Sequence, residues 1–184
     1  MYADLSEYFS LSDCELSTYI DKAALNVVKY LIANGKSIAC AESCTGGMLS
    51  QYITSVSGAS KVFECSVVSY SERIKTKLLG VPDELISEKG VVSAEVALKM
   101  AEGILRLSGT DIGVGITGLA DPETFGEPCP AGTIYVCVVL GSEAHVADLA
   151  LYRYGSFTRE KARRMAVLYA LETVLSFLND NSRI

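Results

Sequence analysis

The stretch of sequence that decides the fold lies between residues 37 and 53, which read SIACAESCTGGMLSQYI. Residues 37–41 are each small or apolar, which is typical of a short strand buried on both faces. Residues 42–47 form a turn of small residues with two glycines, and from Met48 to Ile53 the apolar residues recur at helical spacing. A buried strand, a glycine turn and a helix in this order predict one unit of an α/β sheet.

The rest of the chain continues this alternation of helices and strands. Further helices are expected at 12–34, 71–80, 82–90, 93–105 and 157–178, and further strands at 62–69 and 111–117. Two β-forming stretches, 132–140 and 144–152, flank Gly141, Ser142 and Glu143 and predict an antiparallel hairpin. The pattern as a whole predicts a three-layer α/β/α sandwich with a mixed, mostly parallel sheet and one antiparallel hairpin.

Length and composition are those of a single globular domain. The chain has 184 residues, of which 49% are hydrophobic and 21% charged. We expect one domain over residues 15–184, preceded by a loosely ordered N-terminal extension over residues 1–14. The N-terminus is acidic and lacks a signal pattern, and no apolar run is long enough to span a bilayer. We therefore expect a cytoplasmic protein with no membrane partner.

Charge and residue counts exclude several classes of chemistry. The formal net charge is −6, from 16 basic and 22 acidic residues, which disfavours direct contact with nucleic acid. The six cysteines form no CxxC pair, so we expect reduced thiols that pack as small hydrophobic groups. With His145 as its single histidine, the chain cannot build a multi-histidine metal centre. We expect neither a metal nor a cofactor.

Three segments could carry chemistry at the carboxyl ends of strands, where α/β sheets bind ligands. The 42–47 turn would present helix amides that suit a phosphate or an oxyanion, or it is an ordinary turn with Thr45 as the helix N-cap. Lys75 and Tyr70 could form a base and its partner, although the local pattern alone favours a solvated lysine on a surface helix. Thr117 ends a glycine-rich strand that could equally be a packing element.

Ten pieces of the sequence, in one order along about residues 20–180, resemble the CinA C-terminal domain family. They are 41–47 (AESCTGG), 58–60 (GAS), 68–71 (VSYS), Lys75, 79–81 (LGV), 90–93 (GVVS), 115–120 (GITGLA), 130–135 (PAGTIY), Arg159 and Arg163. The family's activity is nicotinamide-nucleotide amidohydrolysis, in which nicotinamide mononucleotide and water give nicotinate mononucleotide and ammonia. Larger members carry an additional pyrophosphatase domain, and at this length we expect the stand-alone deamidase of pyridine nucleotide salvage.

The resemblance implies a role for individual residues. Ser43 would be the nucleophile, Lys75 and Tyr70 would handle its proton, and Thr117 would supply a polar contact. The substrate-binding residues that it implies are Thr45, Gly46, Gly47, Ser60, Gly118, Arg159 and Arg163. The two arginines, one helical turn apart, suit a phosphate. The resemblance also implies a homo-oligomer, with a dimer favoured.

The loop over 118–131 departs from the family pattern. Relatives typically have Gly-Pro-x-Gly-Gly followed by Lys-Pro-Val-Gly, whereas this chain has Asp121, Pro122 and Glu123, and then Cys129 before Pro130. Two extra acidic residues near an anionic substrate predict weak binding. Two alternatives to a deamidase stay open: a catalytically silent nucleotide-binding module of the same fold, and a competence-associated interaction protein.

Overall fold

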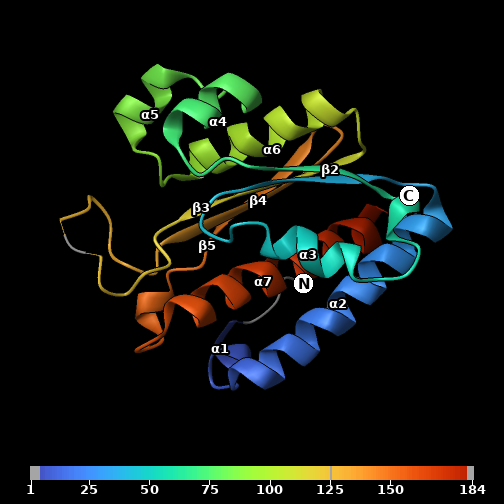
Figure 1. Ribbon diagram of the computed structural model, residues 1–184, viewed down its shortest axis with the longest axis horizontal. Helices are drawn as coiled ribbons and strands as arrows, with labels where there is room; N and C mark the ends of the chain where they lie inside the picture. Colours follow the sequence, from blue (N-terminus) through green and yellow to red (C-terminus); the bar gives the residue numbers. More distant parts are fainter. Residues whose placement is uncertain (1–4, 125, 182–184) are drawn as a thin grey trace.

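The computed structural model of the chain describes residues 5–124 and 126–181, with the side chains described as far as residue 178. A five-stranded sheet, in the order β2-β1-β3-β4-β5, runs through its centre (Figure 1). The strands are β1 (Ile38–Glu42), β2 (Phe63–Val68), β3 (Ile112–Gly118), β4 (Ile134–Leu140) and β5 (Glu143–Asp148). β1 pairs in parallel with β2 and β3, while the β3–β4 and β4–β5 pairings are antiparallel. The predicted mixed sheet is confirmed.

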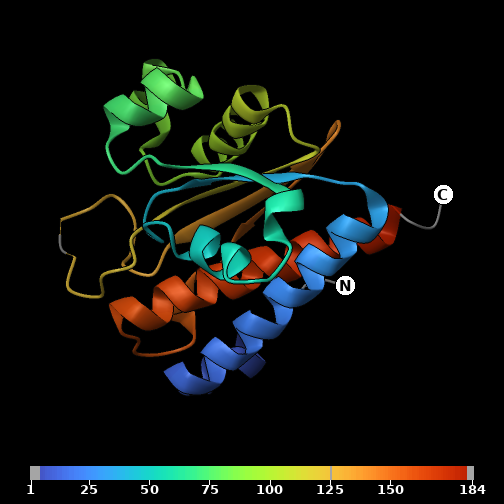
Figure 2. The same ribbon diagram turned by 45° about the vertical axis from the view of Figure 1, so that its right-hand side comes forward.

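Helices cover both faces of this sheet, which confirms the predicted α/β/α layers (Figures 1 and 2). One face carries α4 (Glu72–Leu79), α5 (Asp83–Lys89) and α6 (Ala94–Ser108). The other face carries α2 (Asp13–Asn34), α3 (Met48–Thr54) and α7 (Arg159–Asn181), with the short α1 (Leu5–Phe9) beside α7. The larger hydrophobic core lies on the α2, α3 and α7 side, and two smaller clusters lie under α4, α5 and α6.

Local sequence signals account for the bounds of α2. Ser12 is its N-cap, and the Ser12 hydroxyl and the Glu15 carboxylate exchange hydrogen bonds with each other's backbone amides in a capping box. Its apolar positions, among them Ile20 and Val27, are buried. Gly35 ends the helix in the left-handed conformation, with φ of 60°.

The N-terminal segment for which loose order is expected packs in part on the domain. Leu5 of α1 is buried, and Lys161 of α7 donates a hydrogen bond to the Leu11 carbonyl at 3.0 Å. The expected boundary at residue 14 falls inside α2. Residues 1–4 lie outside the described part of the chain.

The β3 backbone lies directly against α6. A side chain added at Gly113 would place its Cβ 2.4 Å from the Ala101 carbonyl oxygen, and one at Gly115 would come within 2.3 Å of the Ala97 carbonyl oxygen. Both distances are far below van der Waals contact, so only glycine allows this helix to pack so closely on the strand.

The hairpin is shorter than the sequence predicts. β5 ends at Asp148, and the chain then turns into a 3₁₀ helix, η2 (Leu151–Arg153), instead of continuing as strand to residue 152. Ala150 adopts a left-handed conformation with φ of 43°, which ends the strand at this point. Among the described helices, none is both long and apolar enough to cross a membrane.

Candidate functional site

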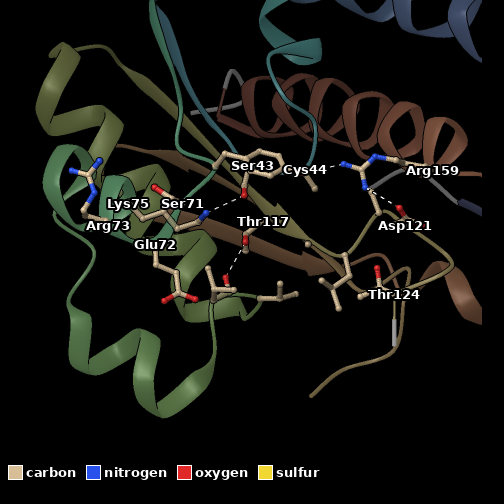
Figure 3. A pocket seen from close by; sticks show the side chains of 16 residues that line it. Ser43, Cys44, Ser71, Glu72, Arg73, Lys75, Thr117, Asp121, Thr124 and Arg159 are labelled. Carbon is tan, nitrogen blue, oxygen red and sulfur yellow. Dashed lines mark hydrogen bonds and ion pairs between the residues drawn. The ribbon is translucent and has the colours of Figure 1, made fainter. Parts of the chain in front are cut away.

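A cavity of about 660 Å³ opens where β1, β2 and β3 end. It is lined by the turn after β1, by the start of α4, by residues 91–92, and by the segment that follows β3 (Figure 3). The position matches the general rule that ligands bind at the carboxyl ends of parallel strands. Each of the three segments that the sequence singled out contributes a residue to the lining of this cavity, namely Ser43, Lys75 and Thr117.

Ser43 and Lys75 form the central pair of the site. Lys75 Nζ lies 3.0 Å from Ser43 Oγ and donates a hydrogen bond to the Ser69 carbonyl at 2.7 Å (Figure 3). The lysine side chain is only 1% exposed, and burial lowers its pKa from 10.5 to about 8. A substantial fraction of Lys75 is therefore neutral near pH 8 and can accept a proton.

Chain geometry explains why these two residues meet. Ser43 follows the last residue of β1, and its amide donates to the Ile116 carbonyl of β3 at 3.0 Å. Ser69 follows β2 and extends the parallel pairing, since its amide donates to the Glu42 carbonyl at 2.8 Å. Lys75 lies in the first turn of α4 and reaches back over this strand end. The surface-lysine alternative, favoured by the local pattern, is excluded because tertiary packing buries this side chain.

Cys44 lies next to the nucleophile candidate but has the wrong protonation state for that role. Its thiol is buried, and burial raises its pKa from 9.0 to about 12. The nucleophilic form of cysteine is the thiolate, which is scarce at neutral pH when the pKa is this high. Of the two neighbours, Ser43 is the one that contacts Lys75.

Tyr70 lines the cavity, but in a different place from the one its expected role requires. Its side chain is 64% exposed, and its hydroxyl accepts a hydrogen bond from Arg159 at 3.0 Å. Within residues 5–124 and 126–181 it has no hydrogen bond to Ser43 or Lys75. Thr117 is buried and donates to the Val91 carbonyl at 2.9 Å, which ties the end of β3 to the chain before α6.

The two arginines separate into different roles. Arg159 lines the cavity and lies 3.5 Å from Asp121 in an ion pair. Arg163 does not line the cavity, because it donates to the Thr45 carbonyl at 2.8 Å and pairs with Glu160 at 3.1 Å. Arg163 thus lies away from the cavity and holds the turn after β1, and contact of both arginines with a phosphate stays a prediction.

Ser60, an expected substrate contact, does not line the cavity. It lies exposed in a 3₁₀ helix, η1 (Ala59–Lys61), which precedes β2. Because β2 runs parallel to β1, the residues before β2 lie at the amino ends of these strands, whereas Ser43 lies at their carboxyl ends. Six residues of strand separate the two ends, roughly 20 Å. Ser60 therefore lies away from this cavity.

The turn after β1 is built differently from the expected N-cap. Gly47, not Thr45, is the N-cap of α3, and the Thr45 hydroxyl is buried without a hydrogen bond in the described residues. Gly46 and Gly47 adopt left-handed conformations with φ of 61° and 95°, which only glycine adopts readily. Their amides donate to the Ser43 carbonyl and to the Glu42 carboxylate, so neither is free for a ligand.

Glu42 is the site residue that sequence reasoning missed. Its carboxylate is 0% exposed and accepts hydrogen bonds from the first turn of α3. The signal that could have found it is an acidic residue at the end of a wholly buried strand, just before a helix N-terminus. Such a residue needs internal donors, and the helix amides supply them.

The loop that departs from the family pattern borders the mouth of the cavity, as the sequence predicts. Gly118, Asp121 and Thr124 are among its lining residues, whereas Glu123 is not. A Cβ added at Gly118 would lie 2.7 Å from the Ile134 Cα, so any side chain there would collide with β4. In the described parts of the chain, no group of three or more His, Cys, Asp or Glu side chains could hold a metal ion.

Comparisons with known proteins agree with this geometry. The family model of the CinA C-terminal domain matches residues 20–178. A putative competence-damage inducible protein of Thermoanaerobacter sp. (strain X514) is 44% identical over 152 residues, which cover 83% of this chain and 36% of that protein. A protein of the same name from Acetivibrio thermocellus is 37% identical over 168 residues, which cover 91% of this chain and 40% of that protein. This chain thus spans well under half of these curated relatives.

Solved structures give the same result for the fold. The competence/damage inducible protein CihA from Agrobacterium tumefaciens superposes with a TM-score of 0.81 at 31% identity, covering 88% of this chain and 96% of that one. A CinA superfamily protein from Escherichia coli superposes with a TM-score of 0.80 at 26% identity, covering 86% and 90% of the two chains.

Proposed function

Because this chain belongs to the CinA C-terminal domain family, we propose that it is a nicotinamide-nucleotide amidohydrolase, which converts nicotinamide mononucleotide and water to nicotinate mononucleotide and ammonia. The single observation that carries this proposal is the buried contact of Lys75 Nζ with Ser43 Oγ at the floor of the cavity. A neutral lysine amine within hydrogen-bond distance of a serine hydroxyl can take the hydroxyl proton, and this activates the serine for attack on an amide.

In the first step Lys75 acts as the base. Its N–H group donates to the Ser69 carbonyl, which leaves the lone pair of the neutral amine free for the Ser43 hydroxyl proton. Ser43 Oγ then bonds to the carboxamide carbon while Lys75 takes the proton. Collapse of the tetrahedral intermediate breaks the C–N bond, and Lys75 returns the proton to the departing ammonia.

The second step releases the acid. Water attacks the nicotinoyl ester of Ser43, Lys75 takes a proton from that water, and the C–Oγ bond breaks with return of a proton to the serine. In both steps negative charge develops on the former carbonyl oxygen. Cys44 lines the cavity, and its amide donates to no other residue within the described part of the chain, so it is the donor we assign to this oxyanion.

The anionic end of the substrate would lie at the mouth of the cavity. Arg159 is held there between Asp121 and the Tyr70 hydroxyl. A guanidinium group binds a phosphate well, but the ion pair with Asp121 must first be broken. This competition predicts weak binding of the substrate. A silent nucleotide-binding module that keeps the cavity and has lost turnover stays the second candidate.

Ammonia release distinguishes the two candidates. The purified chain is incubated with nicotinamide mononucleotide, and ammonia and nicotinate mononucleotide are measured with Ser43→Ala as the control. Equal amounts of both products from the wild type, and none from the variant, are expected. Binding of the mononucleotide without ammonia release would favour the silent module. Sedimentation of the same samples tests the proposed homo-oligomer.

A further inference from the structure

Glu42 is a fully buried carboxylate that directly precedes Ser43 in the chain. One carboxylate oxygen accepts from the Gly47 amide at 3.0 Å and from the Leu49 amide at 3.1 Å. The other accepts from the Ser50 amide at 3.0 Å and from the Ser50 hydroxyl at 2.5 Å. All four partners are donors, and a carboxylate, which only accepts, matches all four.

These contacts close the turn that carries the nucleophile. Glu42 is the last residue of β1, and its partners are the N-cap and the first turn of α3, so the carboxylate joins the two ends of the 43–47 turn. Two further hydrogen bonds hold the same turn. The Gly46 amide donates to the Ser43 carbonyl at 3.0 Å, and Arg163 donates to the Thr45 carbonyl at 2.8 Å.

We propose that Glu42 is a positioning residue for the nucleophile. By fixing the 43–47 turn, it holds Ser43 Oγ against Lys75 and holds the amide of Cys44 where the oxyanion develops. The same contacts fill the first amides of α3 with a carboxylate of the protein itself, so the anionic group of the substrate binds at the mouth with Arg159. This inference rests on the proposed function, because it gives Glu42 its role through attack by Ser43.

The test uses Glu42→Gln, which keeps the size of the side chain and replaces one acceptor oxygen by an NH₂ group facing donors. Its matched control is Asp111→Asn. Asp111 is also a carboxylate that accepts from a backbone amide, a hydroxyl and a further donor, namely the Ser37 amide at 2.8 Å, the Ser37 hydroxyl at 2.9 Å and Lys36 at 2.9 Å. These contacts lie at the amino ends of β1 and β3, and the cavity lies at the carboxyl ends of the same strands.

Two readouts are taken on folded protein well below the unfolding temperature. The first is kcat and KM for nicotinamide mononucleotide. The second is the rate at which a fluorophosphonate labels Ser43, a reaction in which the serine oxygen bonds to phosphorus, fluoride leaves, and the proton goes to Lys75. The labelling rate reports an activated serine without depending on the identity of the substrate.

For Glu42→Gln we expect kcat and the labelling rate to fall together by roughly 100-fold, the loss typical of a small misplacement of reacting groups, with KM changed less than about threefold. Asp111→Asn should label at the wild-type rate. Wild-type labelling of folded Glu42→Gln, or equal slowing by Asp111→Asn, would overturn the inference. If Glu42→Gln does not fold, Ser50→Ala takes its place, because it removes the hydroxyl that donates to Glu42. Labelling of Ser50→Ala at the wild-type rate would then overturn the inference.

The outcomes separate this inference from the proposed function. A wild-type chain that is labelled at Ser43 but releases no ammonia refutes the substrate, and slow labelling of Glu42→Gln would still support positioning. A wild-type chain that takes no label and releases no ammonia has no activated serine, and this result overturns the positioning role as well. If the wild type releases ammonia but takes no label, the kcat of Glu42→Gln decides the test.

Discussion

Replacement of Lys75 by methionine should change how the stability of the protein depends on pH. In the folded chain the pKa of Lys75 is about 8, against 10.5 for a solvated lysine. Below pH 8 the lysine is protonated in both the folded and the unfolded states, and the buried charge destabilises the fold. As pH rises from 8 to 10.5, the folded state loses this proton while the unfolded state keeps it, so the wild type becomes more stable.

The size of this effect follows from the two pKa values. A difference between 10.5 and about 8 corresponds to about 3 kcal/mol in the free energy of unfolding, most of which is gained by pH 10. Lys75→Met keeps most of the bulk of the lysine stem but has no proton to lose. The free energy of unfolding of the wild type minus that of the variant should therefore rise by about 2.5 kcal/mol between pH 7 and pH 10.

Urea denaturation of both proteins at each pH measures this difference. Other titrating groups are common to the two proteins and cancel in the subtraction. Lys77→Met is the matched control, because Lys77 is exposed on the same helix, and its curve should stay parallel to that of the wild type. A difference between the wild type and Lys75→Met that stays constant from pH 7 to pH 10 would refute the burial argument.

Four further results are expected in the ammonia assay. Ser43→Ala should abolish turnover and Cys44→Ala should keep most of it, because a buried thiol with a pKa near 12 supplies almost no thiolate; the reverse pattern would exchange the two assignments. The rate constant kcat/KM should rise about tenfold per pH unit below pH 8 and then level off, as the buried lysine loses its proton, whereas a flat profile would exclude it as the base. Asp121→Asn should lower KM by up to about fivefold, and the gain should shrink in high salt, since the ion pair with Arg159 is half exposed; a salt-independent KM equal to the wild type would show that this pair does not oppose binding. Arg163→Met should lower kcat with little change in KM, because this arginine holds the turn, and a rise in KM alone would return it to the phosphate site.

The sequence predicted the parts of the molecule that depend on local pattern. The strand, turn and helix over 37–53, the hairpin and the position of the 118–131 loop at the cavity follow from residue spacing and from glycine and proline signals. The contacts that define the site are not local. Lys75 meets Ser43 across 32 residues, and Arg159 meets Tyr70 across 89, so only the assembled sheet brings them together.

Two expected contacts, Ser60 and Arg163, lie away from the cavity for a similar reason. Ser60 came with a motif that lies on the chain between Ser43 and Tyr70, but the parallel direction of β2 places it at the amino ends of the strands. Arg163 lies four positions after Arg159 on one helix, which predicts a shared face, yet Arg163 donates to the Thr45 carbonyl. In both cases the direction of a side chain or strand, and not its position in the sequence, decided the outcome.

The close packing of β3 on α6 has a consequence for genetics. In a saturation mutagenesis screen scored only by activity, Gly113 and Gly115 should tolerate no substitution, because even alanine would place its Cβ within 2.4 Å of a helix carbonyl. Their scores would match that of Ser43, although neither glycine lines the cavity. Measurement of protein abundance beside activity separates the two groups: variants of the glycines should disappear from the soluble fraction, and Ser43→Ala should accumulate there as an inactive protein.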